Sequence, residues 1–568
     1  MLSPSVSSTS KRRFLSIPRQ AEARSVSLTT LLVAAALLSS ACGKADREDE
    51  DQPSDTETAT GGAEGSTSEV TTDSSATGGE TSENAPEYLK AENAGTSDLF
   101  GVSLAFSADG NTLVVGANGE SSAGQGVTAD PSNNDAPNAG AVYVFVNVGG
   151  TWQEQAYLKA ENSDAGDGFG GYIALSADGN TLAVGAPYES GSAHGVDGAD
   201  DNEATESGAV YMFSRSGNAW QREAYLKSDS GDEYDMFGFS LALSADGNTL
   251  AIGAEAEDGG SPGVIADPTD KSAPESGAVY VFSRSAGAWA QSAYLKADNP
   301  DVLDHFGGAV ALDAAGSTLA VGAYWEDGAG AGNNSDGSDN AADNAGAVYL
   351  FEHDGSTWRQ LSYLKPSSSD GLLDDNFGSS VSLSANGSLL AVGAPGDGSP
   401  NPGINADRSD QSLAYAGAAY VFARTGETFE QQVYLKASAV GDGDEFGNFL
   451  RLSSAGDRLV VGAALEASSA TGLNGNDQDD SAPEAGAAYL FGSDNGTWEQ
   501  ITYLKAPNSE SGDRFAWSLA LASERDVLAV GATRESSAAT GLGGDQTDNS
   551  AYRAGAVYVY SDVSALSQ

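Results

Sequence analysis

Residue types that often build a specific centre are scarce in this sequence. It has one cysteine, Cys42, so no disulfide can form within the chain, and it has three histidines, His194, His305 and His353, far apart in the sequence. A metal site rich in histidine is therefore not expected. We expect His305 and His353 to lie at the surface.

Basic residues are also few. Asp and Glu total 81 against 27 Lys and Arg, which gives a formal net charge of −54. Such a chain repels the phosphates of nucleic acids and anionic membranes, and it favours cations or basic partners. The same charge could simply keep an exported protein soluble.

The only marked apolar run, residues 28–38, is short for a membrane span. Lys11, Arg12, Arg13 and Arg24 precede it and small residues follow it, which is typical of an export signal. We therefore predict a signal peptide at residues 1–41.

The segment Leu38-Ser39-Ser40-Ala41-Cys42 resembles a bacterial lipobox, in which the cysteine carries a lipid. The leucine stands four residues before the cysteine instead of three, so ordinary secretion is the alternative. The resemblance implies an exported protein of the bacterial cell envelope, anchored through Cys42 at the outer membrane or cell surface. We expect contact with the membrane only through this lipid.

Residues 42–86 consist of Ser, Thr, Gly, Asp and Glu with almost nothing apolar. Such a segment cannot bury enough surface to offset its chain entropy. We predict a disordered tether that holds the following domain away from a membrane.

From residue 87 to residue 568 the chain repeats. The tripeptide Tyr-Leu-Lys recurs about every 69 residues, beginning at Tyr88, Tyr157, Tyr225, Tyr294, Tyr363, Tyr434 and Tyr503. Each period has four short segments of alternating β-branched, aromatic and small residues, and an Asp-Gly type of turn joins the first two. Four antiparallel strands in each of seven units, with no helical stretch, predict an all-β, seven-bladed propeller.

The spacing of the repeats also predicts how the ring closes. The third-strand tyrosine precedes the next Tyr-Leu-Lys by 14 residues, so Tyr558 would require a fourth strand near residue 572, beyond the last residue, 568. The strand at Tyr88 can supply this missing fourth strand. We expect it to pair with residues 555–560, which completes the last blade and removes both sheet edges.

Two elements of each repeat resemble the FG-GAP repeats of integrin alpha-subunit propellers and their bacterial relatives. Phe-Gly stands at Phe100, Phe169, Phe237, Phe306, Phe377 and Phe446, and the seventh copy is Phe515-Ala516. A Gly-Ala element follows 16 residues later, at Gly116, Gly185, Gly253, Gly322, Gly393, Gly462 and Gly531. The resemblance covers the whole repeat region and implies the propeller fold, with a ligand on the face that carries the long loops.

One feature that the resemblance would imply is missing. Integrin repeats often bind Ca²⁺ through several aspartates between their first two strands, whereas that turn here offers a single carboxylate, as at Asp109, Asp178 and Asp246. Multidentate coordination of Ca²⁺ needs more oxygens. The integrin type of calcium site is therefore not expected.

An aspartate precedes every repeat phenylalanine by two residues. The copies are Asp98, Asp167, Asp235, Asp304, Asp375, Asp444 and Asp513. A carboxylate in such a place can accept backbone N–H bonds in a turn, and we expect this structural role.

A second set of acids lies in the long loop between the second and third strands. These Asp-x-x-Asp or Asn pairs are Asp130/Asn133, Asp267/Asp270, Asp336/Asp339, Asp407/Asp410, Asn476/Asp479 and Asp545/Asp548, and the second repeat offers Asp197, Asp200 and Asp201. They could stabilise turns, or they could supply oxygens to Ca²⁺, the one cofactor that the sequence suggests. Both hypotheses stay open at this point.

These loops and the entries to the first strands are expected on one face of the propeller, so the acids form a rim there. Lysine also recurs, at Lys90, Lys159, Lys227, Lys296, Lys365, Lys436 and Lys505, and we expect it to pair with this rim in a structural role.

No nucleophile elbow, histidine triad, phosphate loop or zinc spacing is present, so we expect no enzyme activity. Trp325, Trp517 and Arg451 break the repeat symmetry without suggesting a reaction; Trp325 could contact a sugar or peptide or be buried between blades. The sequence favours a non-catalytic, surface-tethered binding or adhesion module whose acidic face binds a protein or glycan, with or without Ca²⁺. Two alternatives are an envelope hydrolase or lyase with an unrecognised carboxylate site, and a structural envelope protein.

Overall fold

The computed structural model describes residues 85–198, 201–368, 373–522, 524–563 and 566. The chain divides into two units, Met1–Ser66 and Thr67–Gln568, and all described residues belong to the second. The predicted signal peptide, the lipidation site Cys42 and nearly all of the predicted tether lie outside the described residues. Within the described part, no helix has the length and apolar character needed to span a bilayer.

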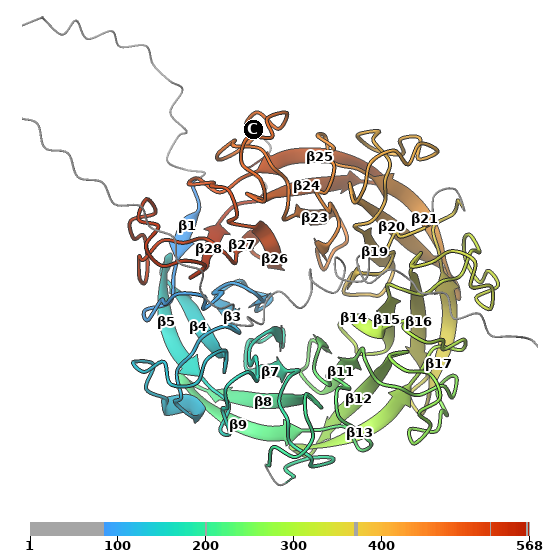
Figure 1. Ribbon diagram of the computed structural model, residues 1–568, viewed down its shortest axis with the longest axis horizontal. Helices are drawn as coiled ribbons and strands as arrows, with labels where there is room; N and C mark the ends of the chain where they lie inside the picture. Colours follow the sequence, from blue (N-terminus) through green and yellow to red (C-terminus); the bar gives the residue numbers. More distant parts are fainter. Residues whose placement is uncertain (1–84, 199–200, 369–372, 523, 564–565, 567–568) are drawn as a thin grey trace, which may run out of the picture. The chain divides into compact units, whose positions relative to one another are not determined.

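The described strands form seven four-stranded antiparallel sheets arranged around a ring, so the predicted propeller is confirmed (Figure 1). Blades 1 to 3 are β2 (Leu104–Phe106), β3 (Thr112–Ala117), β4 (Ala141–Val148) and β5 (Thr151–Leu158); β6 (Tyr172–Leu175), β7 (Thr181–Ala186), β8 (Ala209–Ser216) and β9 (Ala219–Leu226); β10 (Ser240–Leu243), β11 (Thr249–Ala254), β12 (Ala278–Ser285) and β13 (Ala288–Leu295). A short 3₁₀ helix, η1 (Gly126–Thr128), lies in the first long loop.

Blades 4 to 6 follow the same order. They are β14 (Phe306–Leu312), β15 (Thr318–Ala323), β16 (Ala347–His353) and β17 (Trp358–Leu364); β18 (Ser380–Leu383), β19 (Leu389–Ala394), β20 (Ala418–Thr425) and β21 (Thr428–Leu435); β22 (Phe449–Leu452), β23 (Arg458–Ala463), β24 (Ala487–Asp494) and β25 (Thr497–Leu504). The first strand of each blade lies nearest the centre and the fourth forms the outer rim (Figure 1).

Blade 7 joins the two ends of the repeat region. Its strands β26 (Phe515–Ala522), β27 (Val527–Ala532) and β28 (Ala556–Tyr560) are completed by β1 (Glu87–Leu89), which runs antiparallel to β28 with Tyr88 opposite Tyr558. Figure 1 shows the blue strand β1 beside the red strand β28. The predicted closure is therefore confirmed, and the sheet keeps no free edge at β28.

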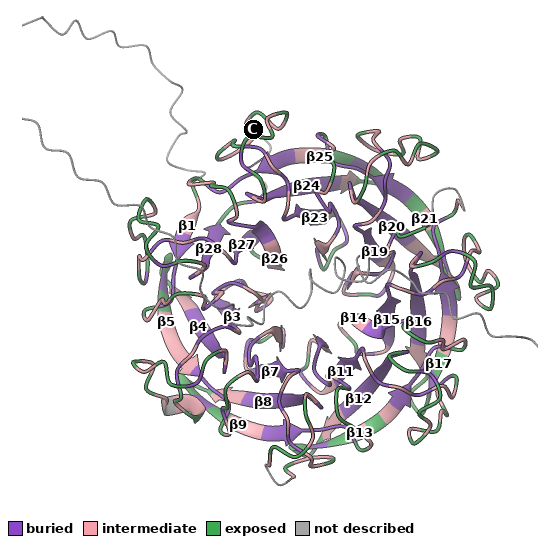
Figure 2. Cartoon of the chain, viewed as in Figure 1, coloured by how far each residue is buried: buried purple, intermediate pink, exposed green. Residues whose placement is uncertain are grey.

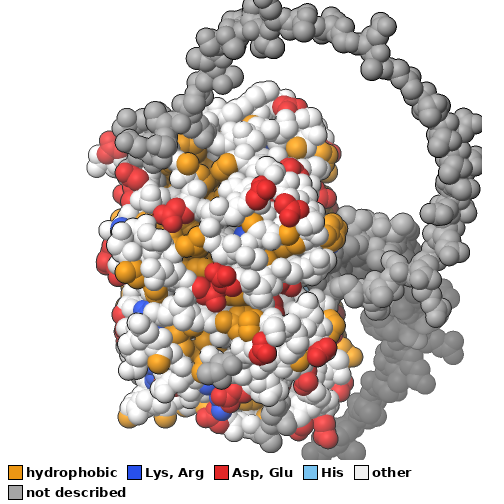
Figure 3. Space-filling view, turned by 90° about the vertical axis from the view of Figure 1, so that its left-hand side faces the viewer, with side chains coloured by type: hydrophobic (Ala, Val, Ile, Leu, Met, Phe, Trp, Pro, Cys, Tyr) orange, Lys and Arg blue, Asp and Glu red, His pale blue; other side chains and the backbone are white. Residues whose placement is uncertain are grey.

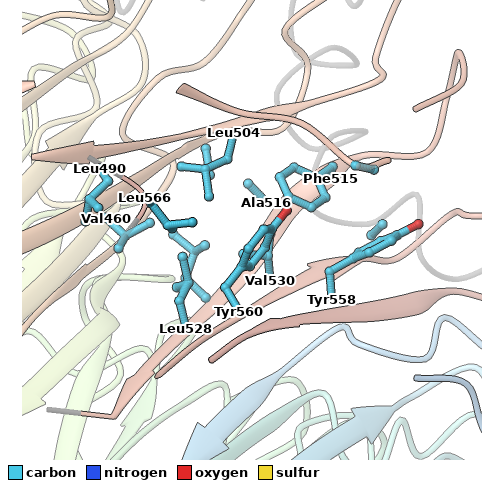
Figure 4. Packing of buried hydrophobic residues seen from close by; sticks show 14 of the residues in the cluster. Val460, Leu490, Leu504, Phe515, Ala516, Leu528, Val530, Tyr558, Tyr560 and Leu566 are labelled. Atoms are coloured by element: carbon cyan, nitrogen blue, oxygen red, sulfur yellow. The ribbon is translucent and has the colours of Figure 1, made fainter. Parts of the chain in front are cut away.

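The hydrophobic core lies between neighbouring blades. Each large cluster of buried side chains draws on two successive sheets; the one in Figure 4 joins Val460 and Leu490 of blade 6 to Leu528 and Val530 of blade 7. Figure 2 shows the middle strands buried and the loops exposed. The alternating apolar residues of the sequence thus pack blade against blade.

The glycines of the two repeat elements lie where one blade touches the next. A Cβ atom on the Gly-Ala glycine would overlap the carbonyl oxygen of the Phe-Gly glycine in the following blade, as at Gly322 against Gly378. The contact recurs around the ring and returns from Gly531 to Gly101; only Gly462 faces an alanine, Ala516. The repeat needs glycine here because the two backbones approach too closely for a side chain.

We predict that Gly322→Ala destabilises the propeller by about 1–3 kcal/mol, the usual cost of overpacking a close contact. Urea unfolding followed by circular dichroism measures this change. Gly171→Ala is the matched control, since the nearest atom to its Cβ would be the Gly168 carbonyl oxygen at 3.3 Å. Equal stability of the two variants would contradict the proposed role of the close backbone contact.

Candidate functional site: the loop face

The loops between the second and third strands and the entries to the first strands leave the sheets at the same end, because each blade is antiparallel. We call this end of the propeller the loop face, and the opposite end, which carries the tight hairpins, the hairpin face. The loops of the loop face span residues 118–140, 187–208, 255–277, 324–346, 395–417, 464–486 and 533–555. In the side view of Figure 3, acidic side chains clearly outnumber basic ones.

The first member of each acidic pair is an exposed residue in a local turn. Asp267 accepts a hydrogen bond of 2.9 Å from the backbone N–H of Thr269. The same bond to the residue two positions later is made by Asp130, Asp336, Asp407, Asn476 and Asp545. These are Asx turns, so the structure shows the turn geometry that one of the two hypotheses required.

The second members are also held within their own loops. Asn133, Asp270, Asp479 and Asp548 accept a backbone N–H two residues on, while Asp339 and Asp410 are exposed. In the second repeat Asp197 accepts from Tyr225 N and Asp201 from Ser192 N, and Asp200 lies outside the described residues. Among the described residues, no group of three or more His, Cys, Asp or Glu side chains is arranged to hold a metal ion.

The loop carboxylates are ionised at neutral pH. Hydrogen bonds from the Ser or Thr two residues on hold the pKa of Asp130, Asp267, Asp336, Asp407 and Asp545 below the ordinary value. Because these residues are exposed, the loop face presents fixed negative charges to solvent. Such charges attract cations and basic groups.

The aspartates before the repeat phenylalanines are buried and have the predicted role in turns. Six of them accept the backbone N–H three residues earlier, at 2.7–2.9 Å: Asp98, Asp167, Asp235, Asp304, Asp444 and Asp513. The seventh, Asp375, accepts a hydrogen bond from Arg408 Nη2 at 2.7 Å, and the residue three positions before it lies outside the described residues. Burial raises the pKa of Asp304 to about 8 and that of Asp98, Asp235, Asp375 and Asp513 to about 7.

The repeated lysines have a structural role, but their predicted partner was wrong. Each is buried and pairs with an acid four residues after the Gly-Ala glycine of its own blade, at 2.7–3.1 Å. These acids are Glu120, Glu189, Glu257, Glu326, Asp397, Glu466 and Glu535, all nearly free of solvent contact. Their constant spacing was present in the sequence, but only the fold shows that the ends of the second and fourth strands meet.

Other polar groups complete this buried network. Tyr363 Oη donates to Glu326 at 2.8 Å, and Asn299 Nδ2, in the connection from the preceding blade, donates to the same carboxylate at 3.3 Å. Asn299 in turn accepts from Tyr349 Oη at 2.9 Å. The network therefore ties the connection that contains Asn299 to the blade that follows it.

We predict that Lys365→Met destabilises the propeller by about 3–5 kcal/mol, because Glu326 would be left buried without its cation. The double variant Lys365→Met/Glu326→Gln should recover part of this loss, since no lone charge remains. Chemical denaturation checks both. The control Arg359→Gln removes a cation from the exposed group with Glu352 and Glu427 and should cost no more than about 1 kcal/mol; a similar loss in all three variants would contradict the buried-pair explanation.

The raised pKa of the buried aspartates predicts a dependence of stability on pH. An unfolded Asp titrates near pH 3.9, so a folded-state pKa of about 8 at Asp304 means that the folded chain holds an extra proton between these values. Stability is therefore lost as the pH rises through this window. Asp304→Asn, which keeps the acceptor oxygen without the charge, should be more stable than the wild type by about 1–3 kcal/mol near pH 8.5 and similar below pH 4. Denaturation at several pH values measures the difference, and parallel profiles for the two proteins would contradict it.

His305 is buried, so the expectation that it lies at the surface is wrong. Only 6% of the residue is exposed; its ring stacks on Tyr324 with centroids 5.3 Å apart and meets Trp325 edge-on at 4.6 Å. Burial lowers the pKa of His305 to about 4. His353 is half-buried beside Trp358, and His194 is exposed.

The same sector contains a buried carboxyl group. Glu255 accepts a hydrogen bond of 2.8 Å from Tyr324 Oη, and burial raises its pKa to about 8. Glu255, His305 and Tyr324 are unlike groups gathered at one junction, between blades 3 and 4. They would be the candidate groups if the propeller were an enzyme.

The three symmetry breakers occupy different places. Trp325 is half-buried against His305, and Trp517 packs on Phe449 with ring centroids 5.1 Å apart. Arg451 is exposed on β22, the innermost strand of blade 6, and its Nε donates to the Leu519 carbonyl at 3.2 Å. None of the three touches the acidic loop pairs.

Comparison with protein families explains the repeat. The family model described as "FG-GAP repeat" matches residues 152–213, 220–282 and 358–422. The chain therefore contains FG-GAP repeats. Each match begins in the fourth strand of one blade and ends in the third strand of the next, so the FG-GAP sequence unit is offset by one strand from the blade.

Solved structures give more distant likenesses to this FG-GAP propeller. A β-propeller domain of Cps50 (Swd1) from Myceliophteria thermophila shares 9% identity, with a TM-score of 0.44, over 84% of this chain and 99% of that one. The WD40 repeats of RRP9 share 9% identity, with a TM-score of 0.43, over 84% and 97%. A putative 6-phosphogluconolactonase from Bacteroides uniformis shares 10%, with a TM-score of 0.40, over 75% and 97%. These likenesses carry no argument about function, and a comparison with curated proteins gave no match.

Proposed function

We propose that this FG-GAP propeller is a non-catalytic binding module, held at the bacterial cell surface by a lipid on Cys42, whose loop face binds basic groups of a protein or glycan ligand. The observation that carries the proposal is the set of exposed, ionised Asx-turn carboxylates on one face. A ring of seven similar loops presents these charges repeatedly. A ligand with several basic groups can therefore engage more than one blade at once.

The turns that hold these carboxylates suit such a role. Each first carboxylate is fixed by its own loop, so little side-chain entropy is lost when a ligand binds. The basic residues of the propeller neutralise little of this set: seven lysines are buried with other acids, although Arg222 Nη1 lies 3.5 Å from Asp197 Oδ1. The charges on the loop face are thus left for a partner.

We predict that a variant with Asp267, Asp270, Asp336, Asp339, Asp407 and Asp410 changed to Asn binds an oligolysine peptide at least about tenfold more weakly than the wild type at low salt. Asparagine keeps the acceptor oxygen of each turn, so the loops should hold their shape. Isothermal titration with the full chain measures the affinity. Higher salt should weaken binding by the wild type as well.

The hairpin face offers a matched control of equal charge. Asp109, Asp178, Asp246, Asp354, Glu427 and Asp494 are exposed acids there, and their change to Asn or Gln should alter the affinity less than about twofold. Equal losses in the two variants would show that binding follows overall charge and would overturn the proposed face.

A separate experiment on the same variants tests whether the loops bind Ca²⁺. Thermal unfolding in EGTA and in millimolar Ca²⁺ should differ clearly if the loops bind the ion, since each site occupied at 100 times its dissociation constant adds about 2.7 kcal/mol. The shift should then disappear in the loop-face variant. No shift in the wild type would mean that the face binds its partner without Ca²⁺.

A further inference from the structure

Three arginines stand together on the loop face of blade 7. Arg514 lies between Asp513 and the start of β26, Arg534 follows the end of β27, and Arg553 precedes β28. We call them the arginine cluster. The equivalent positions of the other six blades carry no arginine, so the FG-GAP fold itself does not need these residues.

The sheet brings the three positions together. Because β27 pairs with both β26 and β28, the ends of these strands lie side by side. The backbone N–H of Arg534 donates to the Asp513 carbonyl at 3.1 Å, next to Arg514. Burial, followed by the positive charges of Arg514 and Arg553, lowers the pKa of Arg534 to about 10.

The cluster is only partly neutralised. Glu484 of blade 6 contacts two of its members, with Oε2 at 2.8 Å from Arg514 Nη2 and 3.5 Å from Arg534 Nη1. Within the described residues Arg553 makes no ion pair; its guanidinium lies over the Tyr552 ring at 4.8 Å. Glu445 also faces Arg514, but burial raises its pKa to about 7, so it is not fully ionised at neutral pH.

The side chains are held in place, and those of Arg534 and Arg553 remain open to a ligand while Arg514 is buried. Arg514 lies over the Trp517 ring at 5.2 Å and is 6% exposed, whereas 14% of the Arg534 side chain is exposed and Arg553 is half-buried. Aromatic rings position a guanidinium without neutralising it. Arg534 and Arg553 therefore keep N–H donors toward solvent.

An excess of positive charge at one place is costly in a chain with a net charge of −54 and many acids to spare. Three neighbouring guanidinium groups, of which only Arg514 and Arg534 contact the carboxylate of Glu484, repel one another, and a bound oxyanion would relieve this repulsion. The planar guanidinium group also matches carboxylate and phosphate oxygens in a bidentate manner. We propose that the arginine cluster binds a small oxyanion, a phosphate or a carboxylate group, on the loop face of blade 7.

The surroundings limit the size of this ligand. The acidic loop carboxylates, among them Asp545 and Asp130 in blades 7 and 1, repel an extended polyanion such as a nucleic acid. A ligand with one or two anionic groups meets the cluster without crossing the rest of the rim. The site is independent of the proposed binding of basic groups, which uses the carboxylates.

The test titrates the full chain with sodium phosphate and, separately, with sodium acetate at constant ionic strength, followed by calorimetry and thermal unfolding. Phosphate, acetate or both should bind the wild type and raise its unfolding midpoint, and the two arms distinguish the phosphate from the carboxylate ligand. Arg534→Gln and Arg553→Gln should each weaken binding at least about tenfold, because each removes donors to the ion. Arg553→Lys should lose less, since it keeps the charge.

A second readout separates a ligand site from a structural cluster. In buffer without the binding anion, Arg534→Gln should unfold at an equal or higher temperature than the wild type, because it removes like-charge repulsion. The control Arg359→Gln removes one exposed arginine near the hairpin face and should leave anion binding unchanged. No binding of either anion at about 20 mM, or an equal loss in the Arg359 control, would overturn the proposal.

Discussion

The whole propeller depends on how closely the backbone of one blade approaches that of the next. The Gly-Ala glycine of each blade lies against the Phe-Gly carbonyl of its neighbour, with no room for a Cβ atom. Next to this contact, the repeat phenylalanine packs edge-on against the third-strand tyrosine of its own blade, as Phe100 does on Tyr143 with centroids 5.3 Å apart. Where Ala516 replaces glycine, it keeps a left-handed backbone with φ of 69°, so the geometry of the contact is preserved at a cost in strain.

Hydrophobic packing alone does not specify which strand pairs with which, and the buried lysine and acid pairs add this specificity. A buried ion pair stabilises a fold weakly, but it penalises any arrangement that leaves one partner alone. In a chain of seven similar repeats, strands could pair in a shifted register or with the wrong repeat. Lys365 finds Glu326 only when the second and fourth strands of one blade end together, so the network favours the correct pairing.

The sequence was most informative where one short segment decides the geometry. The aspartate turns and the Asp-Gly hairpins follow from local spacing, the place of the strand at Tyr88 follows from counting the repeats, and the structure has all of them as predicted. The partner of the lysines and the burial of His305 were missed because they depend on residues far apart in the chain. Glu326 lies 39 residues before Lys365, and His305 is covered by Tyr324 and Trp325 from the next strand end.

Residues that recur in every blade build the propeller, whereas residues that occur once can give it specificity. Residues present in all seven blades, such as the Gly-Ala glycines and the buried lysines, are those that contacts within the ring require. The exposed Asx-turn acids are also repeated, so they give the loop face a charge that is nearly the same in every blade, and a ligand that reads only this charge cannot select one blade. The arginine cluster and the group around Glu255 each occur once, in blade 7 and between blades 3 and 4. If a partner binds this face in a single orientation, such unrepeated groups would determine that orientation. Negative charges repeated in all seven blades cannot distinguish one orientation from another.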